Sequence, residues 1–81
     1  MFTVYALHSI KHNKIYIGCT SNLQERMKSH NELSKKGFTH KYRPWSVAYT
    51  ESFDSKKEAL KREKELKSSR GRSFIRTKLA E

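Results

Sequence analysis

The hydrophobic and polar positions alternate at the start of the chain as they do in strands. Residues 2–8 and 15–19 are rich in β-branched and aromatic side chains, which is typical of strands. Asn13 lies between the two runs and supplies the chemistry of a tight turn. Apolar side chains fall on both sides of the first run, with Val4 on one side and Leu7 on the other. The pattern therefore predicts an antiparallel hairpin that is covered on both faces.

A helical pattern follows, with Leu23 and Met27 on its apolar stripe, and continues to about Leu33. Two pairs at its start have capping-box spacing, so the first turn has two alternative caps. These pairs are Ser21 with Gln24 and Asn22 with Glu25.

The second half of the chain predicts one more strand and two more helices. Residues 45–53 alternate like a strand, and Trp45 is expected in the core. Ser55 and Glu58 form a second capping box for a helix over 56–69, which Gly71 is expected to terminate. Residues 74–79 have the spacing of a short last helix. The order β-β-α-β-α-α over residues 1–81 predicts a single α+β domain, a small three-stranded sheet with helices packed on it.

The charge balance indicates a polyanionic partner. The 81 residues include 18 Lys and Arg against 8 Asp and Glu, a net charge of +10. Nucleic acid is the commonest polyanion, and its binding is driven by counterion release. Two alternatives stay open, an acidic protein partner and a basic surface without a defined partner. The basic residues are not confined to one amphipathic helix, which disfavours a membrane-surface role.

Several other functions find no support in the sequence. Cys19 is the single cysteine, so no disulfide framework is expected. The N-terminal segment lacks a long apolar run, because Lys11 interrupts it, and a cytoplasmic protein without a membrane span is therefore expected. The motifs for nucleotide hydrolysis, zinc proteolysis and ester hydrolysis are absent.

One carboxylate has an unusual position in the helix over 56–69. Ala59, Leu60 and Leu66 are expected on one apolar face of this helix. Glu63 follows Ala59 by four residues and Leu60 by three and precedes Leu66 by three, so it lies near the middle of that stripe. Glu58 and Glu65 point outward. A carboxylate facing a core is costly unless it is paired or binds a cation. An ion pair with Lys or Arg and a metal or catalytic role are the two interpretations.

The first helix and the hairpin carry other candidate residues. Arg26 and His30 are four residues apart and share a face near the helix's buried edge. An Arg fork suits phosphate oxygens, and His exchanges a proton near neutral pH. Tyr5 and Tyr16 taken singly are ordinary packing residues of strands, but Gly18 within a strand often marks a close backbone approach. The basic loop from residue 35 to 43, with Lys35, Lys36, Lys41 and Arg43, is expected to touch the phosphate backbone.

These residues lie in motifs that resemble those of the GIY-YIG nuclease superfamily. Four motifs occur in order: Thr3-Val4-Tyr5 with Tyr16-Ile17-Gly18, Asn22-Leu23-x-x-Arg26-x-x-x-His30-Asn31, Tyr42-x-Pro44-Trp45, and Glu58-Ala59-Leu60-x-x-Glu63-Lys64-x-Leu66-Lys67. They cover nearly the whole chain. The chain resembles most the short stand-alone bacterial members related to the N-terminal nuclease domain of the excision-repair incision subunit. The resemblance departs at Thr3-Val4, which replaces Gly-Ile, and at Cys19, where many relatives have Lys.

The resemblance implies a three-stranded antiparallel sheet flanked by helices, in agreement with the pattern. It implies a metal-dependent endonuclease in which Tyr5 and Tyr16 line the cleft and one of them helps to deprotonate a water. Gly18 would let the backbone pass beside nucleic acid, and Arg26 would steady the scissile phosphate. His30 would orient a tyrosine or relay a proton, and Glu63 would be the only protein carboxylate on Mg²⁺ or Mn²⁺. The expected substrate is nucleic acid, with DNA the first choice; a homodimer or a larger repair or recombination complex is left open.

Two competing interpretations complete the analysis. A non-catalytic basic nucleic-acid-binding module would have the same fold and charge. A ββα-metal nuclease would instead use His30, Asn31 and His40, although no strand pair flanks these residues in the order that such a site needs.

Overall fold

The first two strands form the hairpin that the sequence predicts. In the computed structural model, which describes residues 1–33 and 41–80, β1 (Phe2–Ser9) pairs antiparallel with β2 (Lys14–Thr20). Asn13 in the turn has a φ of 51°, a left-handed conformation that Asn adopts more readily than most residues. The register places Tyr5 opposite Gly18 and Leu7 opposite Tyr16, and this pairing later determines the shape of the site.

The third strand, β3 (Ser46–Phe53), pairs antiparallel with the other side of β1. The strand order is β2-β1-β3, so β1 is central and β2 is an edge strand. The register shifts between Ala6, opposite Tyr49, and Leu7, opposite Val47. This irregularity interrupts the simple alternation expected for β3, and Val47 is left 45% exposed.

The first helix is divided into an α-helical and a π-helical part. It consists of α1 (Leu23–Lys28) and η1 (Ser29–Leu33), so its predicted extent is confirmed but its last turns are wider than in an α-helix. Of the two alternative caps, the structure uses Asn22, whose Oδ1 accepts from the Glu25 amide at 3.1 Å. The Asn22 side-chain amide donates in turn to the Glu25 carboxylate at 3.4 Å.

The C-terminal helices differ from the prediction in their bounds. The helix α3 (Lys56–Lys67) begins at the predicted cap Ser55 and ends before Ser68, which is extended. The prediction that Gly71 terminates this helix was wrong, because Gly71 lies in the first turn of α4 (Ser69–Ala80), a helix as long as α3. A Cβ on Gly71 would overlap the backbone of Leu66. The missing side chain therefore lets α4 start directly against the end of α3.

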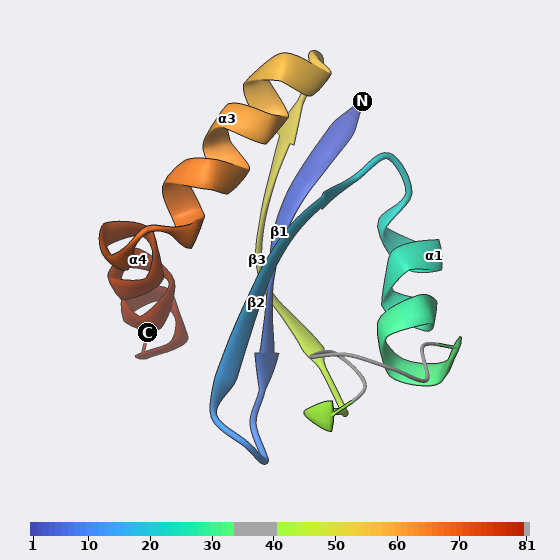
Figure 1. The fold of residues 1–81 in the computed structure, drawn as a ribbon, viewed down its shortest axis with the longest axis vertical. Helices are drawn as coiled ribbons and strands as arrows, with labels where there is room; N and C mark the ends of the chain where they lie inside the picture. The colour runs from blue at the N-terminus through green and yellow to red at the C-terminus, as the bar shows by residue number, and fades with distance from the viewer. Residues whose placement is uncertain (34–40, 81) are drawn as a thin grey trace.

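The helices cover opposite faces of the sheet (Figure 1), with α1 on one face and α3 and α4 on the other. Strand alternation divides the core accordingly. The face under α3 and α4 buries Val4, Ala6, Ile17, Ala59, Leu66 and Ile75. The face under α1 buries Tyr5, Leu7 and Trp45, with Tyr16, Leu23, Met27 and Tyr42 packed against them.

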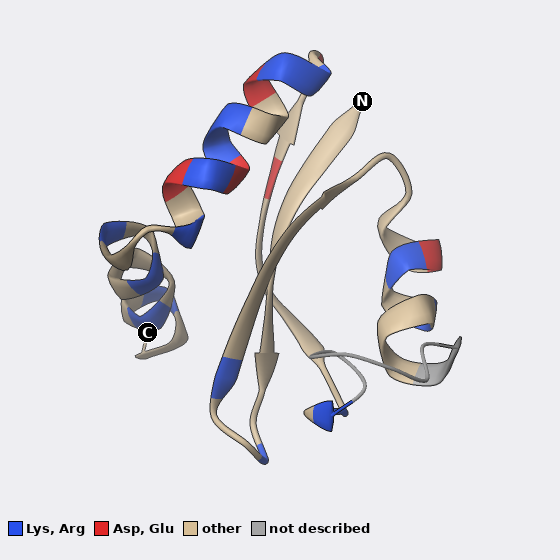
Figure 2. Ribbon diagram, in the orientation of Figure 1, with Lys and Arg blue, Asp and Glu red and all other residues tan. Residues whose placement is uncertain are grey.

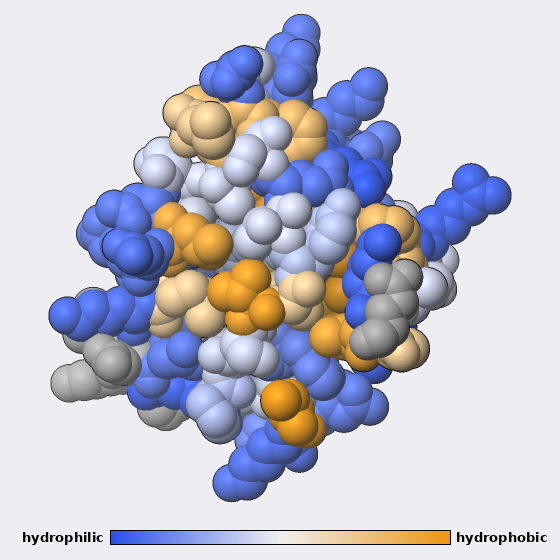
Figure 3. All heavy atoms as spheres, turned by 180° about the vertical axis from the view of Figure 1, so that it is seen from behind, coloured by the Kyte–Doolittle hydropathy of each residue, from blue (hydrophilic) through white to orange (hydrophobic). Residues whose placement is uncertain are grey.

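Exposed apolar side chains are scattered over different elements. Ile10 lies in the hairpin turn, and Leu60 of α3 is 44% exposed, although the sequence placed Leu60 on the buried stripe. On the face shown in Figure 3, hydrophobic side chains form small separate groups among hydrophilic ones. Single exposed apolar residues of this kind are ordinary. Among the helices of residues 1–33 and 41–80, none is long and apolar enough to span a membrane.

Candidate active site

Tyr5 lies across Gly18 at the centre of the site. A Cβ on Gly18 would approach the Tyr5 hydroxyl to within 2.4 Å, so only glycine leaves room for this ring. Tyr5 is 1% exposed, and Gly18 is buried too. The sequence assigned to Gly18 a close approach of backbone to nucleic acid. In the structure, the close approach at Gly18 is made by the protein's own phenol.

His30 joins the two tyrosines. Its Nε2 lies 3.0 Å from the Tyr5 hydroxyl, and its ring lies edge-on to Tyr16 with centroids 4.9 Å apart. The Tyr5 and Tyr16 centroids are 6.4 Å apart. His30 is 6% exposed, whereas Tyr16 is only half-buried. Tyr16 is therefore the tyrosine of the pair that reaches solvent, and Tyr5 and His30 fix the position of its ring.

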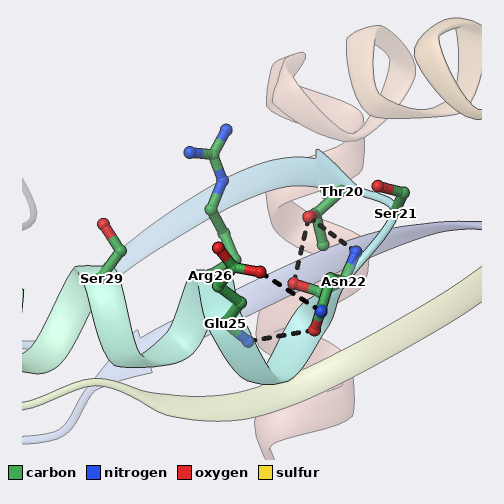
Figure 4. Close-up of a pocket in the computed structure, with 6 residues that line it drawn as sticks. All are labelled: Thr20, Ser21, Asn22, Glu25, Arg26 and Ser29. Atoms are coloured by element: carbon green, nitrogen blue, oxygen red, sulfur yellow. Dashed lines mark hydrogen bonds between the residues drawn. The ribbon is translucent and has the colours of Figure 1, made fainter.

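Arg26 of α1 lines a hollow of about 380 Å³ with Thr20, Ser21, Asn22, Glu25 and Ser29. In Figure 4 its side chain extends away from the capping network formed by Thr20, Asn22 and Glu25. The expectation that Arg26 lies at a buried edge was wrong, because α1 buries none of its residues and Arg26 is exposed. Its long stem nevertheless brings the guanidinium close enough to lower the pKa of Tyr5.

Glu63 approaches the same region from the opposite face of the sheet. Its side chain is 21% exposed, while Glu58 and Glu65 are exposed as expected. Its negative charge raises the pKa of Tyr5 and of Cys19 on β2, which places it near the edge strand. The ion-pair interpretation has limited support, since Lys67 Nζ lies 3.8 Å from the carboxylate and Lys67 is 53% exposed. A pair of this length at the surface contributes little.

Burial decides the protonation of the two innermost groups. Burial, followed by the charge of Tyr16, raises the pKa of Tyr5 to about 12, although Arg26 acts to lower it. Burial and the charge of Arg26 lower the pKa of His30. At neutral pH the Tyr5 phenol therefore keeps its proton and the His30 ring is neutral. Tyr5 acts as a hydrogen-bonding support and is not suited to be a base.

The predicted phosphate-binding loop is described only in part. Lys35 and Lys36 lie outside the described residues, as does His40 of the ββα-metal alternative. Lys41 is exposed and lies over the Tyr42 ring, 5.4 Å from its centroid. Arg43 is half-buried and donates to the Asn31 carbonyl at 2.8 Å, so part of its donor capacity serves the fold.

Sequence reasoning missed the role of Asn31. Its amide group donates to the Trp45 carbonyl at 3.1 Å and accepts from the Trp45 amide at 2.7 Å. This reciprocal pair ties η1 to the start of β3 beside the site. The metal-ligand role that the ββα-metal alternative gave to Asn31 would have to break both bonds. The sequence shows that Asn31 follows the candidate His30 and that Trp45 is a core candidate. It does not show that the two residues pair.

The donors available for a metal ion are few. In residues 1–33 and 41–80, no group of three or more His, Cys, Asp and Glu side chains is placed to hold one. The arrangement instead brings one carboxylate, one exposed guanidinium and one solvent-reaching phenol to the edge strand. A guanidinium and a cation on a carboxylate are the groups that bind phosphate and offset the charge of its transition state.

The GIY-YIG catalytic domain family matches residues 1–77. A UPF0213 protein of Bacillus velezensis is 43% identical over 51 residues, 63% of this chain and 52% of that protein. A UPF0213 protein of Staphylococcus haemolyticus is 40% identical over 57 residues, 70% of each chain. The match thus spans about half the length of the first relative and more of the second.

A solved structure agrees with these matches. The solution NMR structure of a UPF0213 protein from Bacillus halodurans superposes with a TM-score of 0.56 at 30% identity, over 95% of this chain and 84% of the other. The chain belongs to the GIY-YIG catalytic domain family. The predicted fold and family are thereby confirmed.

Proposed function

We propose that this protein is a metal-dependent endonuclease that hydrolyses phosphodiester bonds of nucleic acid, with DNA as the expected substrate. One observation carries the proposal. Residues 1–77 match the GIY-YIG catalytic domain family, and three of the candidate residues lie together in the structure. The Tyr5 hydroxyl is 3.0 Å from His30 Nε2, and the His30 ring lies edge-on to Tyr16.

Glu63 is the residue that would hold the ion, and its environment fits Mg²⁺ or Mn²⁺. The side chain is partly open to solvent, and its contact with Lys67 is long. Mg²⁺ keeps several of its waters and needs only one or two carboxylates. When bound, such an ion would supply Lewis acidity toward phosphate oxygen and lower the pKa of a coordinated water.

The remaining roles belong to the chain's own side chains. Arg26, exposed in its hollow, would hold the phosphate oxygens with its fork and offset the negative charge of the transition state. Tyr16 is the tyrosine that reaches solvent, so it would orient the attacking water with Oη. It would accept the water's proton as the phenolate, after losing its own proton to solvent. Tyr5 and His30 would keep the Tyr16 ring in place through the 3.0 Å hydrogen bond and the edge-on contact.

The test is cleavage of plasmid DNA, branched DNA and RNA, with and without Mg²⁺. Glu63→Gln and Arg26→Ala should each lower the cleavage rate by about 10²- to 10³-fold, the usual cost of losing one stabilising group. Glu65→Gln is the matched control, because Glu65 lies on the same helix and is 54% exposed. It should cut within about twofold of the wild type.

Two results would overturn the proposal. Equal cutting by Glu63→Gln and the wild type would show that Glu63 holds no essential ion. Binding without any cutting, on all three substrates and with Mg²⁺ or Mn²⁺, would make the protein a non-catalytic nucleic-acid-binding module.

A further inference from the structure

A groove runs along the outer edge of β2, below the candidate active site. One hollow of about 240 Å³ is lined by Ile15, Tyr16, Ile17, Lys67 and Arg72. A second of about 240 Å³ is lined by Asn13, Lys14, Ile15, Arg72 and Arg76. The two hollows share Ile15 and Arg72 and therefore adjoin each other; together we call them the edge groove. Tyr16 belongs both to the edge groove and to the site.

The edge groove is positively charged. Its four cationic residues, Lys14, Lys67, Arg72 and Arg76, are all exposed, and none of its described lining residues is acidic. Figure 2 shows basic positions and no acidic ones on α4, whereas α3 carries both. Lys67 Nζ lies 3.8 Å from the carboxylate of Glu63. Clustered charge of one sign attracts polyanions and raises their local concentration.

Part of the edge groove is held in place before any ligand arrives. Arg76 donates from Nη1 to Asn13 Oδ1 at 3.1 Å and so ties α4 to the hairpin turn. Arg72 and Arg76 are four residues apart on α4 and share a face. A side chain that is already ordered loses less entropy on binding.

We propose that the edge groove binds the sugar-phosphate backbone of nucleic acid on one side of the scissile phosphate; this inference rests on the proposed function. From Gly18 to Lys14 the edge strand advances four residues, about 13 Å. At about 3.4 Å of helix axis per nucleotide, this length corresponds to about four nucleotides. The fold thus supplies both a reactive centre and a track that leads away from it.

An acidic protein segment is the other polyanion that the edge groove could attract. Continuity with Tyr16 favours nucleic acid, because one backbone can then occupy the site and the edge groove together. The test below therefore includes an acidic peptide as a competing ligand.

The experiment measures binding of the full chain to a fluorescein-labelled duplex DNA of about 20 base pairs in EDTA, over a range of salt concentrations. Removing Arg72 and Arg76 together as Gln should reduce the magnitude of the slope of log K against log salt by about 2 and weaken binding more than about tenfold at low salt. Arg72→Lys with Arg76→Lys should keep the slope, since both charges remain.

The matched control is Lys61→Gln with Arg70→Gln, which also removes two positive charges, but outside the edge groove. Lys61 lies beside Glu51 and Glu58, and Arg70 lies in a hollow with Glu65. This pair should change the slope by less than about 0.5. Circular dichroism checks folding. If the Arg72 and Arg76 double variant does not fold, each single Gln variant should still reduce the slope by about 1.

The outcomes separate the two proposals. An equal loss of DNA binding in the Arg72/Arg76 and Lys61/Arg70 double Gln variants would overturn the edge groove. Cleavage by the wild type would then show that the proposed function stands without it. A wild type that neither binds nor cuts would overturn both. A poly-glutamate peptide that binds more tightly than DNA and depends on Arg72 and Arg76 would assign the edge groove to an acidic protein.

Discussion

The two faces of the sheet have different roles, although the same strand, β1, contributes side chains to both. On the α3 and α4 side, Val4 and Ala6 are fully buried among aliphatic neighbours such as Leu66 and Ile75. On the α1 side, Tyr5 carries a polar hydroxyl into the interior and needs His30 as its partner. The first face stabilises the domain through area removed from water. The second face buries polar groups, and each of them needs a hydrogen-bond partner, because an unpaired buried polar group lowers stability.

This contrast between the aliphatic and the aromatic face explains where the candidate active site can form. At the edge strand β2, groups from both faces of the sheet can approach each other, whereas the central strand β1 is paired on both sides. Glu63 comes from the aliphatic face and Arg26 from the aromatic face, and both act on Tyr5. The comparison predicts that changes on the first face affect stability most, and that changes on the second affect the ordering of the site.

The largest effect is expected for Leu66→Ala. Leu66 is 1% exposed in the aliphatic core, and a cavity there should lower the free energy of unfolding by about 2–5 kcal/mol. Leu60→Ala on the same helix is the matched control, since Leu60 is 44% exposed and should cost less than about 1 kcal/mol. Urea unfolding measures both variants. Similar losses for the two would show that α3 does not pack as described.

A smaller effect is expected for Gly18→Ala on the aromatic face. The new Cβ would overlap Tyr5, and moving that ring should cost about 1–3 kcal/mol of unfolding free energy. In a Tyr5→Leu background the same substitution should cost less, because the overlapping phenol is gone. A double-mutant cycle by urea unfolding gives the coupling. Additive costs would mean that Gly18 is required for a reason other than Tyr5.

The smallest effect is a pH dependence from His30. Burial and Arg26 lower its pKa below the usual 6.5. At pH values between the lowered pKa of the folded chain and 6.5, the unfolded chain therefore binds more protons than the folded chain. The free energy of unfolding should therefore rise with pH through this window and fall on acidification, by at most about 1.4 kcal/mol per pH unit. Among the described residues, Tyr5, Tyr16 and Arg26 are ionisable groups that face His30.

The measurement compares unfolding of the wild type and of His30→Gln at about pH 7.5 and about pH 5. The variant should be less stable at the higher pH and lose less on acidification. An equally steep loss in both proteins would assign the pH dependence to other groups.

Local sequence was enough to predict the elements and the caps. The hairpin with Asn13 in its turn and the helix start at Ser55 are present, and the first helix starts at Asn22, one of its two candidate caps. Strand alternation and capping depend on residues a few positions apart. The four ordered motifs were also enough to identify the family. The unusual position of Glu63 followed from helical periodicity alone.

Errors occurred where packing in three dimensions, and not the local pattern, decided the outcome. Gly71 has the composition of a helix end, but close contact with Leu66 places it inside α4. Leu60 fits the apolar stripe, yet no element covers it fully. The role of Asn31 depends on Trp45, fourteen residues away and on another element.

The sequence by itself thus determined the elements, their order, the basic charge and the identity of the candidate residues. The tertiary structure decided which tyrosine is enclosed, what fills the space above Gly18, and that groups from two faces meet at β2. The physical reason is that burial and electrostatic interaction depend on distance in space, and pairing and packing bring together residues that are far apart along the chain.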